Sequence, residues 1–189
     1  MATIARLIFP LLLVACIVGC ASVSVTDYQD LKPTLDLETF FRGKLTAHGV
    51  VKDRSGRVIR TFNATIDASW ENGEGVLDEH FEFNDGELDQ RKWILTPTGE
   101  NRYTGTAGDV VGAGVLEVAG NSVFLDYTLR IPLDESSIDV HVDDRMYLVA
   151  PGVLLNESEM RKFGVRVGSI LLVILQPDAQ PPTVGAAPS

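Results

Sequence analysis

Five side chains that could orient or react with a ligand occur within rows of apolar residues: Glu79, Arg91, Trp93, Tyr127 and Asp144. Glu79 has the same alternating phase as Leu77 and Phe81, so its carboxylate should point to the apolar side of that segment. A buried charge without a partner is costly, so such a residue is usually paired or functional. Two interpretations stay open: a polar cluster that orients the head group of a ligand in a cavity, and an ion pair that only closes the fold.

A catalytic role for these residues is the weaker interpretation. Glu79 or Asp144 could act as the general base of an isomerase or hydrolase, which would require a raised pKa and an accessible cavity. The sequence has no G-x-S-x-G nucleophile motif. The neighbours Asp143 and Asp144 point to opposite faces of a strand, so they cannot form a close acid and base pair. We therefore predict no catalytic residue and a protein that is not an enzyme.

Metal ions and nucleic acids are also poor candidates as partners. The three histidines fall on the polar phase of separate segments and lack the short spacing of zinc ligands: His48, His80 and His141. The chain has 16 Lys plus Arg against 26 Asp plus Glu, a formal net charge of -10, whereas nucleic-acid binding needs clustered basic residues. We expect no metal, no cofactor and no nucleic-acid partner.

The elements that must position these side chains are strands. Residues 58–70 and 122–131 largely alternate between apolar and polar residues, which is typical of half-buried strands. About nine segments are predicted as strands: 44–52, 57–70, 76–83, 87–95, 102–107, 110–118, 122–131, 138–149 and 165–175. A meander of this length removes its unpaired edges best by closing into a barrel. We predict an all-β fold, a single antiparallel β-barrel of about 8–10 strands.

One short helix is predicted near the C-terminus, over residues 157–163. Met160 and Phe163 are three residues apart, Asn156 is a suitable N-cap and Gly164 would end the helix. This helix would pack on the barrel as a lid, with gating of a ligand mouth as the alternative.

The N-terminus has the form of an export signal. Arg6 precedes an apolar run over residues 7–18, which is too short to span a bilayer. The following cysteine sits in Ile17-Val18-Gly19-Cys20, which resembles the bacterial lipobox, so Cys20 is the expected lipidation site. We divide the chain into a signal peptide (1–19), a lipidated N-terminus and tether (20–35), a β-barrel domain (36–175) and a disordered proline-rich tail (176–189).

Several stretches of the chain resemble a family of bacterial lipoproteins known as the domain of unknown function numbered 3833. These include Phe40-Phe41-Arg42-Gly43, Glu79-His80-Phe81, Trp93, Tyr103-Thr104-Gly105-Thr106-Ala107, Asp109-Val110-Val111-Gly112 and Lys162-Phe163-Gly164. The resemblance implies a single exported barrel domain similar to lipocalins, with no established activity. Members tend to be encoded near fatty-acid-modifying enzymes, which implies a connection with lipids.

The expected function is the binding of a lipid or other apolar molecule in the barrel. The protein would be held by its lipid anchor on the periplasmic face of the outer membrane. The alternative is a barrel with a filled core that acts as a structural or accessory protein and binds an envelope partner through its acidic surface. The interior volume of the barrel separates these two functions, because a ligand needs a cavity.

Overall fold

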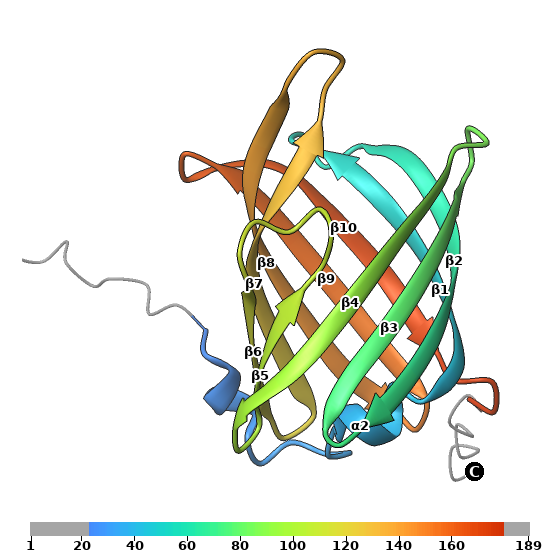
Figure 1. Cartoon of the computed structure of the whole chain (residues 1–189), viewed down its shortest axis with the longest axis vertical. Helices are drawn as coiled ribbons and strands as arrows, with labels where there is room; N and C mark the ends of the chain where they lie inside the picture. Colours follow the sequence, from blue (N-terminus) through green and yellow to red (C-terminus); the bar gives the residue numbers. More distant parts are fainter. Residues whose placement is uncertain (1–22, 180–189) are drawn as a thin grey trace, which may run out of the picture.

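The computed structural model describes residues 23–179 as one closed barrel of ten antiparallel strands (Figure 1). The predicted signal peptide, Cys20 and residues 180–189 of the predicted tail lie outside the described residues. The strands are β1 (Gly43–Asp53), β2 (Val58–Glu71), β3 (Glu74–Phe83), β4 (Leu88–Gly99), β5 (Arg102–Thr106), β6 (Gly114–Ala119), β7 (Ser122–Pro132), β8 (Ser137–Ala150), β9 (Val153–Lys162) and β10 (Val165–Leu175). Each strand pairs with its sequence neighbour, and β1 pairs with β10 to close the barrel. The predicted all-β antiparallel barrel is confirmed.

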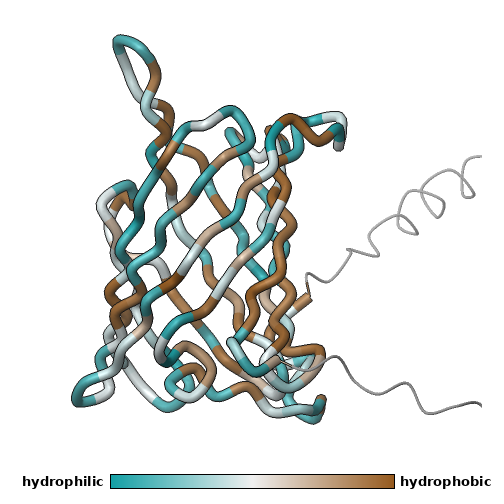
Figure 2. The backbone as a smooth tube through the Cα atoms, turned by 90° about the vertical axis from the view of Figure 1, so that its right-hand side faces the viewer, coloured by the Kyte–Doolittle hydropathy of each residue, from teal (hydrophilic) through white to brown (hydrophobic). Residues whose placement is uncertain are grey.

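Alternation of apolar and polar residues builds the wall of this barrel. On β2, Phe62, Ala64 and Ile66 are buried, whereas the residues between them are exposed. Hydrophobic and hydrophilic residues accordingly alternate along the strands (Figure 2). The inward residues bury their apolar surface against the opposite wall, which stabilises the fold by about 25 cal/mol for each Å² removed from water.

The predicted helix over residues 157–163 is wrong, because this segment is the strand β9. Its residues pair with β8 on one side and with β10 on the other. Asn156 is therefore not an N-cap, and it faces the interior from the middle of the barrel wall. Phe163 and Gly164 both have positive φ angles, 51° and 77°, and form the tight turn from β9 to β10. Two polar inward residues, Asn156 and Ser158, hid the alternation that marks a strand.

The helices of the described chain lie instead before the first strand. They are a single 3-10 turn, η1 (Val25–Tyr28), and a short α-helix, α2 (Leu37–Phe40). No helix within residues 23–179 has the length and apolar character needed to cross a membrane.

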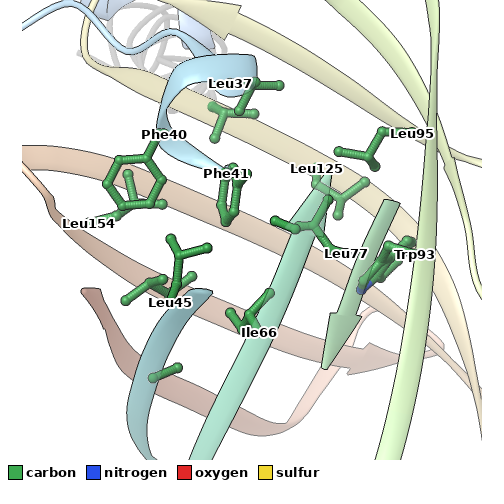
Figure 3. Close-up of a cluster of buried hydrophobic side chains, with 14 of the residues drawn as sticks. Leu37, Phe40, Phe41, Leu45, Ile66, Leu77, Trp93, Leu95, Leu125 and Leu154 are labelled. Carbon is green, nitrogen blue, oxygen red and sulfur yellow. The ribbon is translucent and has the colours of Figure 1, made fainter. Parts of the chain in front are cut away.

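The helix α2 plugs one end of the barrel (Figure 1), and its apolar side chains point into the core there (Figure 3). Leu37, Phe40 and Phe41 are buried there among leucines of the strands. The indole nitrogen of Trp70 donates a hydrogen bond to the carbonyl oxygen of Phe41 at 2.7 Å, and the side-chain amide of Gln176 donates to that of Phe40 at 2.9 Å. No helix among residues 23–179 covers the opposite end of the barrel, which we call the mouth.

The N-terminal segment packs against the outside of the barrel near the plugged end. Val25 and Leu35 are buried, and the amide of Leu35 donates to the carbonyl oxygen of Gly120 at 2.8 Å. The ring of Tyr28 contacts those of Phe124 and Tyr147, with centroid distances of 5.7 and 5.4 Å. The described part of the predicted tether, residues 23–35, is thus attached to the barrel wall.

Candidate functional site

A cavity of about 170 Å³ lies in the barrel lumen between α2 and the mouth. On β1, β2 and β10 every residue that lines it is apolar: Ala47, Val51, Phe62, Ala64, Ile66, Ile170, Leu172 and Ile174. The polar lining residues all come from β3, β4, β7, β8 and β9. The lumen therefore has one apolar wall and one wall that carries polar groups.

The structure brings all five candidate residues to this cavity. Glu79 on β3 and Arg91 on β4 are directly opposite each other across the two strands. Tyr127 on β7 and Asp144 on β8 also line the cavity. The Trp93 ring packs edge to face on Tyr127 with a centroid distance of 5.3 Å. Residues as far apart as 65 positions in the sequence thus lie around one cavity, because each side chain points into the lumen from its own strand.

Arg91 is paired with Asp109, a residue of the connection between β5 and β6. The Nε atom of Arg91 donates to Oδ1 of Asp109 at 3.1 Å and its Nη2 atom donates to Oδ2 at 2.6 Å. Two-pronged pairs of this kind are among the stronger hydrogen bonds in proteins. Burial alone would lower the pKa of Arg91, but the hydrogen bonds and negative charge of Asp109, together with the charge of Glu79, outweigh it and raise the pKa. Arg91 therefore stays positively charged, and the carboxylate of Asp109 already neutralises this charge.

Asp144 is the centre of a buried hydrogen-bond cluster. Ser158 donates its hydroxyl hydrogen to Oδ1 of Asp144 at 2.7 Å, and the side-chain amide of Asn156 donates to the same oxygen. Burial raises the pKa of Asp144 to about 6, although the hydrogen bonds from Asn156 and Ser158 act in the opposite direction. These two partners on β9 hold the carboxyl group in place.

Glu79 differs from Asp144 because no side chain among residues 23–179 forms a hydrogen bond or ion pair with it. Burial raises the pKa of Glu79 to about 7, the positive charge of Arg91 lowers it and the negative charge of Asp144 raises it further. The surface that this residue retains faces the cavity. A carboxyl group of this kind can exchange a proton near neutral pH and can accept hydrogen bonds from a bound molecule.

The protein family follows from comparison with known proteins. A family model described as "Protein of unknown function (DUF3833)" matches residues 14–176. The chain belongs to this family. None of the curated proteins matches the DUF3833 chain.

Two solved structures share the fold of this DUF3833 protein. An S-type phycobiliprotein lyase, CpeS, from Guillardia theta has 10% sequence identity and a TM-score of 0.56 over 77% of this chain and 95% of its own. A protein of unknown function of the DUF3598 family from Nostoc punctiforme has 11% identity and a TM-score of 0.53 over 82% of this chain. The match spans 53% of the Nostoc chain. These likenesses establish the barrel fold.

Sequence reasoning missed three residues that form hydrogen bonds with the predicted side chains of the DUF3833 site. Asn156 was interpreted as the N-cap, and Ser158 as part of the predicted helix, in the segment that is in fact β9. Asp109 lies in a connection, where alternation carries no signal, and its only sequence indication was the family-like stretch over residues 109–112. Its position is set by the backbone, because the amide of Arg130 donates to the carbonyl oxygen of Asp109 at 2.7 Å.

The histidines lie away from the lumen of the DUF3833 barrel. All three are exposed on the outer face, and each contacts a polar neighbour there. Within residues 23–179 no group of three or more His, Cys, Asp or Glu side chains is arranged to hold a metal ion. The site can accept hydrogen bonds, exchange protons and bury apolar surface.

Proposed function

We propose that this protein binds a lipid or another apolar small molecule in the barrel lumen and does so without catalysing a reaction. The observation that supports this function is the lumen cavity, which has one wholly apolar wall and a few convergent polar groups. Binding sites for small molecules usually combine these features, with apolar lining for affinity and polar groups for orientation. The two solved structures support the barrel fold, and they carry no evidence on which molecule is bound.

The size of the cavity limits the ligand. Its volume of about 170 Å³ exceeds the roughly 150 Å³ of an engineered apolar cavity that binds benzene. It is smaller than the roughly 300–1,000 Å³ of a typical drug-sized site. We therefore propose that a single narrow apolar group, such as part of one hydrocarbon chain, occupies the lumen.

The proposed location is the periplasmic face of the outer membrane, with an acyl anchor on Cys20. This part of the proposal rests on the lipobox-like residues 17–20. A polar domain of net negative charge gains little from anionic head groups, so the acyl chains would provide the membrane contact. Mass spectrometry of the N-terminal peptide and fractionation of a Cys20→Ser variant test it; an unacylated peptide or unchanged membrane retention would contradict it.

Native mass spectrometry tests the binding function. The delipidated full chain is incubated with a periplasmic lipid extract, and we expect a reproducible mass increase from a bound apolar molecule. In the Ala64→Leu variant the larger side chain fills part of the lumen, so a smaller fraction of the protein should carry a bound molecule. The matched control is Thr65→Leu, which adds an apolar side chain at the next residue on the exposed face of β2. A wild-type protein that stays empty would overturn the proposed function.

A further inference from the structure

We infer that the lumen recognises an apolar molecule whose head group is a cationic amine, and that it discriminates against a free carboxylate. This inference rests on the proposed binding function and specifies the chemical class of the ligand. It follows from how the charged side chains of the lumen are paired.

The cation of the lumen is already neutralised. Within residues 23–179, Arg91 is the one basic side chain that lines the cavity, and it forms three hydrogen bonds to the carboxylate of Asp109. An anionic head group would have to compete with Asp109 for Arg91. The lumen therefore lacks a free positive charge for an anionic ligand.

The acidic side chains of the lumen exceed this cation in number. Glu79, Asp89 and Asp144 line the cavity together with Arg91. Asp144 is held by two donors from β9, but Glu79 has no such partner among the described residues. An ammonium group beside Glu79 would supply the missing donor and offset the negative charge, forming a charge-assisted hydrogen bond.

Tyr127 is a second, independent indication of a ligand. This residue is only 8% exposed, and its hydroxyl group forms no hydrogen bond with any described residue. This hydroxyl keeps some accessible surface, so it is open to a hydrogen bond from a molecule in the cavity. Since Tyr127 faces the same cavity as Glu79, a head group with several N–H donors could satisfy both side chains.

Amine binding should be linked to the protonation of Glu79. The groups that act on this carboxyl are Arg91 on β4, Asp144 on β8, Asp109 in the β5–β6 connection and Asp78 on its own strand. An ammonium ion favours the deprotonated carboxylate, so binding displaces a proton from Glu79. With its pKa at about 7, the affinity should rise about tenfold between about pH 6 and about pH 8.

The test compares octylamine, octanol and octanoate, which share a chain length and differ in head group. Each is titrated into the full chain carrying Cys20→Ser, with tryptophan fluorescence and calorimetry as readouts, since Trp93 lines the cavity. We expect octylamine to bind about tenfold more tightly than octanol, and octanoate to bind most weakly. Equal or tighter binding of octanol or octanoate overturns the inference and leaves the binding function intact. Failure of all three to bind overturns the inference, and an empty barrel in the lipid-extract experiment overturns the binding function as well.

The Glu79→Gln variant locates the preference in this side chain. We expect it to lose the preference for octylamine over octanol and the dependence on pH, while octanol still binds and so reports a folded lumen. Glu82→Gln is the matched control, because Glu82 is on the same strand and exposed on the outer face. An undiminished preference for octylamine in Glu79→Gln contradicts the inference.

Discussion

Replacing Glu79 by Gln should change how the stability of the barrel depends on pH. Burial raises the pKa of this carboxyl from its ordinary 4.5 to about 7. The folded protein therefore holds the proton more tightly than the unfolded chain does. The stabilisation from this group is complete below about pH 4.5 and is lost as the pH rises through about 7.

The size of this effect follows from the two pKa values. A tenfold difference in proton affinity between the folded and unfolded states corresponds to about 1.4 kcal/mol. For a carboxyl whose pKa changes from 4.5 to about 7, the free energy of unfolding should fall by about 2.5 kcal/mol between about pH 5 and about pH 8. Gln has a similar shape and no titratable proton, so Glu79→Gln lacks this contribution.

Urea unfolding at several pH values, followed by tryptophan fluorescence, measures the difference. Effects of the other carboxyl groups, including Asp144, occur in both proteins and largely cancel when the variant is subtracted from the wild type. Relative to the wild type, Glu79→Gln should gain stability as the pH rises. The exposed Glu82→Gln control should follow the wild-type curve. Parallel curves for the wild type and Glu79→Gln would refute the assignment of a raised pKa to Glu79.

Three further substitutions test the core, the attachment of the N-terminal segment and the pair between Arg91 and Asp109. Leu154→Ala should lower the free energy of unfolding by about 2–5 kcal/mol in urea melts, because Leu154 is fully buried at the plugged end. Gly120→Ala should release the N-terminal segment, seen as faster hydrogen exchange, because a Cβ atom there would lie 1.8 Å from the carbonyl oxygen of Tyr28. Asp109→Ala should cost about 1.5–3 kcal/mol in urea melts, since it leaves the Arg91 guanidinium without its partner.

Each of these expectations has an outcome that contradicts it. The outward neighbour Leu155 is 40% exposed, so Leu155→Ala should cost much less than Leu154→Ala; equal losses would argue against the core position of Leu154. Unchanged exchange in Gly120→Ala would contradict the close approach to Tyr28. Wild-type stability in Asp109→Ala would mean that its pair with Arg91 contributes nothing.

Every strand except β9 could be predicted from the sequence, because apolar residues dominate the inward positions of the other strands. Alternation marks β2 and β7 clearly, because almost every inward residue is apolar. The same pattern is hidden on β9, where the inward Asn156 and Ser158 serve Asp144. The error in the helix prediction therefore occurred where polar side chains are needed inside the barrel.

The candidate site was predictable only in part for a related reason. Glu79 and Asp144 interrupt apolar rows, so the alternating phase of their strands was enough to place them inside. Asp109 reaches Arg91 from a connection whose path depends on closure of the barrel and on its backbone hydrogen bond from Arg130. A contact that depends on tertiary closure has no local sequence pattern.

The attachment of the N-terminal segment near the plugged end determines how the barrel would stand on a membrane. With the acyl anchor proposed at Cys20, even a fully extended chain could separate it from Val23 by only about 11 Å. The bilayer would then lie beside η1 and the plugged end, and the mouth would be directed towards the aqueous space. A ligand would have to arrive through that space, so the barrel would exchange molecules with soluble donors or acceptors rather than extract them from the bilayer beneath it.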